Sequence, residues 1–473
     1  MDIHLRLEGR RDLSGQIYRQ LRAGIVDGRL AAGERLPSSR ELADRLGVSR
    51  QTTLDVFERL SAEGFLCPRP GAGTFVAPGI ARTAVPNPAI AADGAGDWLQ
   101  PEAVPAHSLE FRGGVTDKRV FPFTAWRRCV NHALRVQARD RGHYGDPAGE
   151  DELRLAVSRY LGFHRALSCT PDDIIITHGA QQALDLIARI VLRPGDVVAM
   201  EDPGYPPARA CYEAHGAAVV GVPVDDEGIV VDHLPPQARL VYVTPSHQFP
   251  LGMPLSLPRR IALLEWAQQR DAIIIEDDYD GEFRFEGRAL EALKNLDRAD
   301  RVVYVGTFSK TIFPELRIGY LVPPRTLNPS LRRSKQLADW HSASLTQTAL
   351  AKFMLDGDFA RHLRRMHGLY RTRRQILLSH LRQDLSPWLT PIVPIAGIHL
   401  SAMLKPGISE SGLLAAAAAQ SIGLYGIAGF YRAGPPQAGL LFGYGGMADD
   451  EIDAALSTLA TILPHVGGYG GQP

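Results

Sequence analysis

The sequence has few cysteines and no long apolar run, and both absences limit what the protein can be. Four cysteines occur in 473 residues, without paired spacing, so neither a disulfide framework nor a zinc site is expected, and no other metal site is expected either. No run of about 18 apolar residues is present. Residues 1–11 are polar and lack the apolar core of a signal peptide. We therefore expect a cytoplasmic protein with no membrane partner.

The chain also lacks an excess of charge of either sign. Lys and Arg together number 52, as do Asp and Glu, so the whole-chain basic signature of nucleic-acid binding is missing. This counts only weakly against DNA binding, because a small basic domain can be joined to a large neutral one. At 45 % hydrophobic and 22 % charged, the composition is that of an ordinary globular protein.

Composition changes sharply near residue 78, which predicts a multidomain chain. Residues 12–77 alternate helical patterns with short turns, as in a small α+β domain. Residues 78–108 are rich in Pro, Ala and Gly without a period, which is typical of a linker. Between residues 109 and 465, short β-branched runs such as LVYVT alternate with helical patterns. That alternation predicts an α/β domain with a mainly parallel sheet.

The first domain carries a helix-turn-helix pattern. A helix is expected from Ser14 to Asp27, and the run LPSSRELADRLGVSRQTTLDVFERL predicts two more helices around a turn at Gly47. Ser38 or Ser39 is expected to cap the first of these two, and Ser49 the second. Leu54, Phe57 and Leu60 are expected on the inner face of the last helix. The following FLCPRPGAGTFV suits a two-stranded wing.

Three polar residues begin the last helix, at the place where a recognition helix touches base edges. Arg50 can pair with guanine, Gln51 with adenine, and the methyl group of Thr52 can contact thymine. The geometry alone fits a small protein-interaction module equally well.

The segments SSRELA, GVSR and GxGTFV closely resemble the winged helix of GntR-type bacterial regulators, over about 65 residues. The resemblance implies that Arg40, Arg50 and Thr52 contact double-stranded DNA and that the wing near Gly73 approaches the minor groove. With Ser49 and Gln51, these residues form the predicted DNA-binding set.

The most informative segment of the large domain is GTFSKTIFPELRIGY, in which Lys310 follows an apolar strand. Such a lysine can form a Schiff base with an aldehyde cofactor. Thr307, Ser309 and Arg317 lie beside it and could hold a phosphate. A lone lysine in this position would more often be an ordinary surface residue.

Three upstream segments support the interpretation of Lys310 as a cofactor residue. Asp277 and Tyr279 follow the strand in IIIEDDYDGEF, and ligands bind at the carboxyl ends of strands in open α/β sheets. An Asp there can keep a pyridine nitrogen protonated, although three acids in a row could also bind a metal. Ala180 and Gln181 open a helix whose free amides form an anion site. Tyr205, in EDPGYPP, could stack on a planar ring or simply pack.

These signals, in this order, resemble fold-type I pyridoxal-phosphate (PLP) enzymes, the aspartate aminotransferase superfamily. The resemblance implies that Lys310 carries the cofactor, Asp277 pairs with its ring nitrogen and Tyr279 reaches its ring hydroxyl. It also implies that Tyr205 stacks on the ring. The predicted phosphate ligands are Ala180, Gln181, Thr307, Ser309 and Arg317. Tyr144 would reach the phosphate of a partner subunit, so a homodimer with a shared site is expected.

Two departures from the enzymes stand out. Their Asn-Pro-x-Gly turn, whose Asn touches the ring hydroxyl, reads SHQFPLG here, with Phe249 in the Asn position. His247 and Gln248 are the candidates to replace that Asn. The last strand, LLFGYGG, has no preceding Arg to grip a substrate carboxylate, and Arg432 is the nearest candidate.

A GntR-type winged helix, a linker and an aminotransferase-like domain together resemble the MocR/GabR subfamily of transcription regulators. The resemblance implies that the large domain senses an amine or amino-acid effector, or PLP itself, through Schiff-base (aldimine) chemistry at Lys310, with Arg432 contacting the effector. Transaminase activity is expected to be weak or lost. The alternative is an authentic aminotransferase with an accessory DNA-binding domain.

Overall fold

The computed structural model describes residues 5–9, 11–79, 107–287 and 291–466 and divides into two compact units, residues 1–95 and 96–473. Residues 80–106 of the expected linker lie outside the described residues. The domain boundaries at residues 77 and 109 therefore stay predictions. Within the described ranges, no helix combines the length and apolarity needed to cross a membrane.

The smaller unit is a three-helix domain with a two-stranded wing. Its elements are α1 (Leu13–Val26), α2 (Ser39–Leu46), α3 (Arg50–Ala62), β1 (Leu66–Arg69) and β2 (Gly73–Val76). The N-caps are Ser38 on α2 and Ser49 on α3, each accepting a backbone N–H bond, and Gly47 ends α2 in the left-handed region. The pattern-based expectation of helix-turn-helix and wing is confirmed.

One expectation about the core of this unit was wrong. Leu54 is only half-buried, whereas Thr53 and Val56 are fully buried beside Phe57 and Leu60. Thr53 can turn inward because its hydroxyl donates 2.7 Å and 3.0 Å hydrogen bonds to the carbonyls of Ser39 and Arg50. Thr53, with its hydroxyl hydrogen-bonded, therefore occupies the buried position that the apolar pattern predicted for Leu54.

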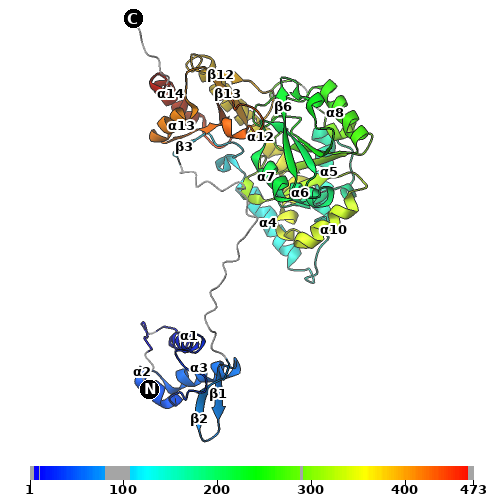
Figure 1. Cartoon of the computed structure of the whole chain (residues 1–473). Helices are drawn as coiled ribbons and strands as arrows, with labels where there is room; N and C mark the ends of the chain where they lie inside the picture. Colours follow the sequence, from blue (N-terminus) through cyan, green and yellow to red (C-terminus); the bar gives the residue numbers. More distant parts are fainter. Residues whose placement is uncertain (1–4, 10, 80–106, 288–290, 467–473) are drawn as a thin grey trace. The chain divides into compact units, whose positions relative to one another are not determined.

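The larger unit is built on an eight-stranded sheet of order β4-β11-β10-β9-β8-β5-β6-β7 (Figure 1). Neighbouring strands from β10 to β6 are parallel, while β11 and the short β7 run antiparallel to their neighbours, so the expectation of a mainly parallel sheet is confirmed. The strands are β4 (Ile175–Thr177), β5 (Val197–Asp202), β6 (Ala218–Asp225), β7 (Gly228–Ile229), β8 (Ala238–Val243), β9 (Ile273–Asp278), β10 (Val302–Thr307) and β11 (Gly319–Val322).

Alternate residues of the strands face two apolar layers. Val198 and Met200 of β5 pack with α6 (Gly179–Val191) and α7 (Pro206–Ala214), whereas Ala199 packs with α8 (Leu257–Arg270). Because both faces are covered, only strand ends are open to a ligand. The other helices of this unit are α4 (Phe123–Gln137), α5 (Asp151–Arg165), α9 (Leu293–Leu296), α10 (Asn328–Asp339), α11 (Ser344–Leu355), α12 (Asp358–Arg382), α13 (Glu410–Ala419) and α14 (Asp449–Val466).

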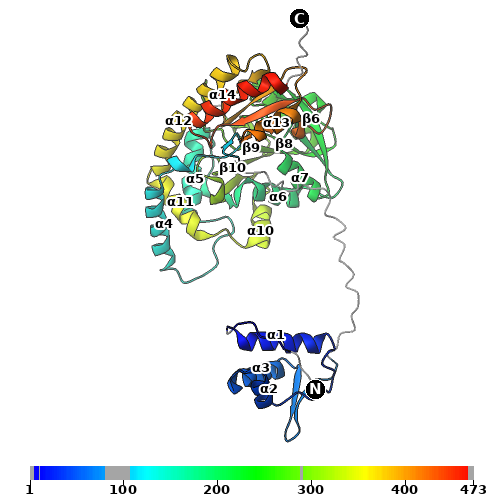
Figure 2. The ribbon, with the colours of Figure 1, turned by 90° about the vertical axis from the view of Figure 1, so that its left-hand side faces the viewer.

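A second, antiparallel sheet of order β12-β13-β16-β15 forms the C-terminal part of this unit, where α12 and α14 run side by side (Figure 2). Its strands are β12 (Leu389–Ile392), β13 (His399–Leu404), β15 (Tyr425–Gly426) and β16 (Gly439–Gly443), while β3 (Leu109–Glu110) pairs separately with β14 (Ile422–Gly423). The short 3₁₀ helices are Lys118–Val120, Pro171–Asp173, Val231–His233, Pro314–Leu316 and Ala428–Phe430.

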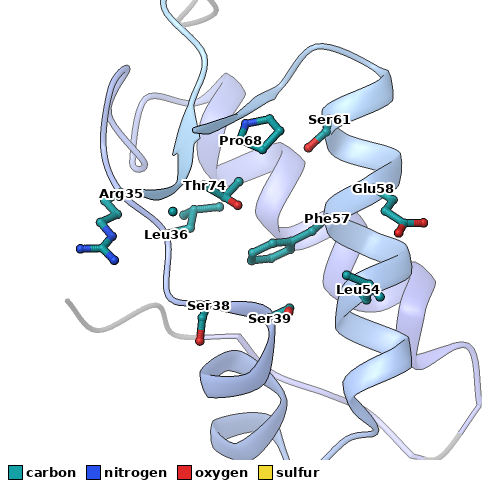
Figure 3. Close-up of a pocket in the computed structure, with 11 residues that line it drawn as sticks. Arg35, Leu36, Ser38, Ser39, Leu54, Phe57, Glu58, Ser61, Pro68 and Thr74 are labelled. Atoms are coloured by element: carbon teal, nitrogen blue, oxygen red, sulfur yellow. The ribbon is translucent and has the colours of Figure 1, made fainter. Parts of the chain in front are cut away.

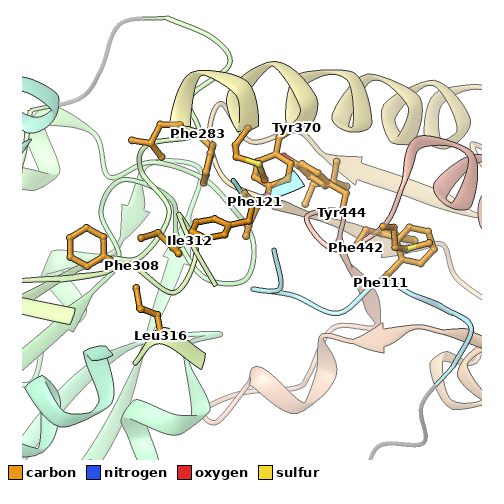
Figure 4. Close-up of a cluster of buried hydrophobic side chains, with 14 of the residues drawn as sticks. Phe111, Phe121, Phe283, Phe308, Ile312, Leu316, Tyr370, Phe442 and Tyr444 are labelled. Atoms are coloured by element: carbon orange, nitrogen blue, oxygen red, sulfur yellow. The ribbon is translucent and has the colours of Figure 1, made fainter. Parts of the chain in front are cut away.

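One aromatic-rich cluster joins the two sheets of the larger unit (Figure 4). Phe111 meets Phe442 of β16 edge-on at 5.2 Å between ring centroids, and Tyr370 of α12 meets Phe283 at 4.8 Å. Phe308 and Ile312, which flank Lys310, belong to the same cluster. The lysine turn is therefore fixed by packing on both sides.

Candidate functional site

The start of α3 presents polar side chains at the surface of the smaller unit. Arg50 and Gln51 are exposed, and the Gln51 amide donates a 2.6 Å hydrogen bond to Asp55. Thr52 is half-buried, with its hydroxyl oxygen 2.8 Å from that of the capping Ser49. The capped end therefore fixes Ser49 and Thr52, while Arg50 extends freely enough to reach a base edge.

The wing adds further cations to this surface. Gly73 has φ of 109°, and a Cβ there would lie 2.9 Å from Arg35 Nε, so the guanidinium crosses directly over the wing backbone. Arg69 lies over the Phe75 ring at 4.7 Å, and Arg40 is exposed on α2. Arg35 was not among the predicted residues. The signal that could have found it is its position just before LPSS, at the entry to α2.

Between α2, α3 and the wing lies a cavity of about 470 Å³ (Figure 3). Its lining mixes Leu54 and Phe57 with Arg35 and the hydroxyl residues Ser38 and Ser39. Leu54 is half-buried because it lines this cavity. Of the residues predicted to bind DNA, only Gly73 is among those that line this cavity.

In the larger unit, the predicted cofactor residues meet at the carboxyl ends of β9 and β10. Asp277 lies opposite Val305 in the parallel pairing of these strands, five residues before Lys310. Asp277 is buried, and its Oδ2 accepts a 2.6 Å hydrogen bond from the Tyr242 hydroxyl of β8, while Oδ1 has no partner. Burial raises the pKa of Asp277 to about 6. Tyr242 was missed because buried tyrosines in strands are usually core residues.

Lys310 extends into the same buried region. Its Nζ donates a 2.9 Å hydrogen bond to the carbonyl of Gly114, where a Cβ would overlap the amine. Burial lowers the pKa of Lys310, while the carboxylates of Asp280 and Asp277 act in the opposite direction. Burial therefore shifts the amine toward its neutral form, which is the nucleophilic one.

A group of donors beside Lys310 suits a phosphate. Thr307 and Ser309 are buried, with their hydroxyl oxygens 3.0 Å apart. Arg317 donates a 2.8 Å hydrogen bond to the His178 carbonyl, and a Cβ at Gly179 would lie 3.0 Å from its guanidinium. Because α6 begins at Gly179, its first N–H groups have no carbonyl partner within the helix.

Two predicted phosphate ligands open α6 itself. Ala180 is half-buried in its first turn. Gln181 is exposed, and its side chain donates a 3.2 Å hydrogen bond to the Pro207 carbonyl of α7. Its backbone therefore faces the anion site while its side chain joins α6 to α7.

Two tyrosines and one phenylalanine form an aromatic wall at the site. Tyr205 and Tyr279 meet Phe249 edge-on at 5.5 Å and 6.2 Å between ring centroids. Burial raises the pKa of Tyr205 to about 12, and the Asp277 carboxylate acts in the same direction. Tyr205 therefore lies close enough to Asp277 for the two groups to interact electrostatically. Such closeness is needed if Tyr205 is to stack on a ring that Asp277 holds.

Two predicted residues lie elsewhere. Tyr144 is 74 % exposed and packs on Trp340 at 4.5 Å between ring centroids. Arg432 places its guanidinium 3.6 Å from Glu213, while its backbone N–H and that of Ala433 bond to Asp202 at 2.6 Å and 2.8 Å. Neither side chain meets the Lys310 site within one chain.

The described residues fit pyridoxal phosphate. Asp277 offers a buried carboxylate oxygen without a partner, which is the acceptor that a protonated ring nitrogen needs. Lys310 follows β10, and Arg317 precedes β11, which pairs with both β10 and the strand β4 that leads into α6. These groups would hold the ring, the aldehyde carbon and the phosphate respectively.

Comparison with known families assigns both units. Residues 13–76 match the gntR family of bacterial regulatory proteins, and residues 114–420 match aminotransferase class I and II. The GntR domain implies DNA binding. The aminotransferase-like fold by itself leaves activity open.

Individual relatives combine the same two parts. The "Probable rhizopine catabolism regulatory protein MocR" of Rhizobium meliloti is 36 % identical over 97 % of this chain and 95 % of its own length. The "HTH-type transcriptional regulator TauR" of Rhodobacter capsulatus is 37 % identical over 80 % of this chain and 81 % of its own. A crystal structure of Pyrococcus horikoshii kynurenine aminotransferase in complex with PMP matches with a TM-score of 0.69. It is 29 % identical and covers 76 % of this chain and 92 % of that one.

The match to MocR runs through both units rather than through the aminotransferase-like part alone. The chain belongs to the MocR-type GntR family of transcription regulators, with a helix-turn-helix DNA-binding domain and an aminotransferase class I and II domain.

Proposed function

We propose that this regulator binds PLP at Lys310 and senses an amine or amino-acid effector, or PLP itself, in its large domain. The observation that carries the proposal is the buried Asp277 carboxylate, whose Oδ1 has no partner and whose charge acts on the Lys310 amine, in a chain that also carries a winged helix. The proposed division is a DNA-binding domain at 12–77, a linker at 78–108 and an effector domain at 109–465, in a cytoplasmic protein.

The roles of the residues follow from their chemistry. Bound PLP supplies an aldehyde that reacts with primary amines and a ring that withdraws electrons. Burial shifts the Lys310 amine toward its neutral form, Asp277 would keep the ring nitrogen protonated, and Tyr205 would cover the ring face. Thr307, Ser309, Arg317 and the first amides of α6, at Ala180 and Gln181, bind the phosphate. Tyr279 directs its hydroxyl to the ring hydroxyl.

An effector amine would compete with Lys310 for the cofactor. Arg432 is proposed to attract a carboxylate or sulfonate on the effector, which must then displace Glu213 from the guanidinium. Only an effector that binds two arrangements of the domain unequally can shift them, and a tenfold preference corresponds to about 1.4 kcal/mol.

A homodimer completes the proposal. Tyr144 and Trp340 are both large, exposed and packed on each other, which suits a surface that meets a second copy. In such a dimer Tyr144 would reach the partner's phosphate, while the winged helices would read two half-sites of one operator.

A second candidate function is an authentic aminotransferase, favoured by the match to kynurenine aminotransferase. Against it, LLFGYGG lacks the carboxylate-binding Arg and Phe249 replaces the Asn of the turn.

One experiment separates the two functions. The full-length protein is loaded with PLP, reduced with borohydride and mapped by peptide mass, and amino-acid turnover and operator binding are measured in parallel. We expect PLP on Lys310, specific DNA binding and little turnover. Sustained turnover without specific DNA binding would overturn the proposal, as would a missing label on Lys310.

A further inference from the structure

His247 and Asp280 form a buried pair at the end of β9, beside the proposed cofactor site. Each side chain is 1 % exposed. The backbone is shaped around the imidazole, because a Cβ at Gly397 would overlap the ring and one at Gly252 would lie 3.2 Å from its Nε2. Gly397 also has a positive φ of 96°. Two glycines therefore make room for one histidine.

The orientation of this imidazole is set by Asp280 and Tyr279. Nδ1 lies 3.0 Å and 3.1 Å from the two Asp280 oxygens and 3.1 Å from the Tyr279 hydroxyl. The Tyr279 hydroxyl donates a 2.9 Å hydrogen bond to the backbone carbonyl of His247. That bond uses the only phenolic proton, so the Nδ1–H of His247 is the donor toward Asp280 and the Tyr279 oxygen. Tyr279 is thus held by both the main chain and the side chain of His247.

Asp280 is fixed in turn and remains charged. Its Oδ2 accepts a 3.1 Å hydrogen bond from the Ile398 N–H. Burial acts to raise the pKa of Asp280, but His247 and the hydrogen bonds outweigh it and lower that pKa below its usual value. Its negative charge also favours the protonated Lys310 amine. The other titratable or charged groups facing this network are His399, Tyr444, Asp277, Asp278, Glu201 and Arg317.

The neighbouring turn offers no other donor to Tyr279. Phe249 is apolar and packs edge-on against Phe430 at 5.2 Å between ring centroids. The Gln248 amide nitrogen donates 2.8 Å and 2.7 Å hydrogen bonds to the carbonyls of Pro203 and Phe249, and its Oε1 accepts the Leu251 N–H at 3.0 Å. Gln248 is therefore committed to the turn itself.

We infer that His247 is a positioning residue that replaces the Asn of the enzymes' turn by holding the Tyr279 hydroxyl in place, with Asp280 fixing His247. The inference rests on the proposed function, because Tyr279 meets a ligand only where PLP is bound. The inference assigns the role of that Asn to His247 together with Asp280, 33 positions later, rather than to Phe249, which occupies the Asn position.

The test uses the full-length protein and four variants. His247→Phe removes the donor, His247→Asn restores a shorter one, and Asp280→Asn removes the charge. His380→Asn is the matched control. His380 lies on α12 and contacts Asp384 at 2.8 Å and Asp453 of α14 at 2.9 Å, and it is not among the proposed cofactor residues. For each protein, PLP affinity and the pH midpoint of the visible absorbance of bound PLP are measured, with thermal unfolding of the PLP-free form as a check of folding.

We expect His247→Phe to weaken PLP binding about tenfold, as for the loss of one buried hydrogen bond to a polar partner. Asp280→Asn should also weaken PLP binding, because His247 loses the charged partner that fixes its imidazole. It should lower the absorbance midpoint as well, because a charge that favours the protonated amine is lost. His247→Asn should recover most of the affinity, and His380→Asn should match the unaltered chain.

Three results would overturn the inference. The first is a wild-type affinity and midpoint in His247→Phe, and the second is an Asn variant no better than the Phe variant. The third is an unchanged PLP affinity in Asp280→Asn, because Asp280 is inferred to act through His247; this result also decides the matter if His247→Phe does not fold. If the unaltered chain takes up no PLP, the proposed function itself fails. If it binds PLP and the variants behave like it, only the role of His247 is wrong.

Discussion

The two units place their polar residues in opposite ways. On α3 of the smaller unit, Arg50 and Gln51 are exposed and their side chains cost the fold little. In the larger unit, Asp277 and Lys310 are buried and their pKa values shift toward the neutral forms. Side chains that contact DNA at a surface stay hydrated and cost no desolvation free energy. Ionisable groups in a buried ligand site carry a desolvation cost in the free protein, which a bound ligand of opposite charge can offset.

The largest expected effect is that of Lys310→Ala. Without the amine, PLP cannot be attached, so the visible absorbance of bound PLP and the effector response should be lost completely. Operator binding should largely remain, because α3 lies in the other unit. Spectroscopy and a DNA-binding assay check both halves. A normal spectrum in the variant would show that the assignment of Lys310 is wrong.

Asp277→Asn should separate stability from ligand binding. Because burial raises the folded pKa of Asp277 from 3.8 to about 6, the folded state resists ionisation. Its ionisation therefore destabilises the PLP-free protein as pH rises from about 4 to 6, and above pH 6 the Asn variant should be more stable by about 3 kcal/mol. Below pH 4 the difference should vanish. Denaturant unfolding at pH 4 and pH 7 measures it.

The same variant should bind PLP more weakly, since the acceptor of the ring nitrogen is lost. Glu282→Gln is the control, because burial also raises the pKa of Glu282 to about 7. That variant should gain stability without losing PLP. Weakening of PLP binding by both variants would show that the effect is not specific to Asp277.

Arg50→Ala tests the role of an exposed side chain at the start of α3. Loss of a bidentate base contact should cost about 1–3 kcal/mol of specific operator affinity. PLP spectra should not change. Arg29→Ala is a control at an exposed arginine outside α3, whose guanidinium pairs with Asp27 at 3.2 Å. Equal losses in both variants would point to general charge attraction rather than base recognition.

The smallest expected effect is that of Ser49→Ala. The Ser49 side chain accepts the Thr52 N–H at 3.1 Å, so its loss should destabilise the DNA-binding unit by about 1 kcal/mol. Calorimetry of the full chain should show an earlier transition for this unit alone. A change in the unfolding of the larger unit would contradict the independence of the two units.

Local patterns were sufficient for much of the fold. Cap residues and the Gly47 turn place α2 and α3 correctly because capping is a local interaction. The apolar run at 174–176 forms strand β4 only from Ile175, since Pro171–Asp173 form a 3₁₀ helix just before it. The antiparallel β11 was not predicted, because strand direction is decided by partners far away in the sequence.

The candidate site was predicted only where chemistry and local sequence coincide. Lys310 and Asp277 meet at neighbouring strand ends, and strand ends can be found from the sequence. The contact of Arg432 with Glu213 and that of His247 with Asp280 join segments 219 and 33 residues apart, respectively. No periodicity or motif reports such pairs, because they depend on how loops pack.

The short pairing of β3 with β14 has a mechanical consequence. Leu109 and Glu110 lie beside Ile422 and Gly423, so the start of the described part of the larger unit is paired with its C-terminal part. That anchor adjoins β15 and, through it, the Ala428–Phe430 turn and Arg432. A displacement of this C-terminal part would therefore move Leu109 and Glu110 with it, without passing through the eight-stranded sheet.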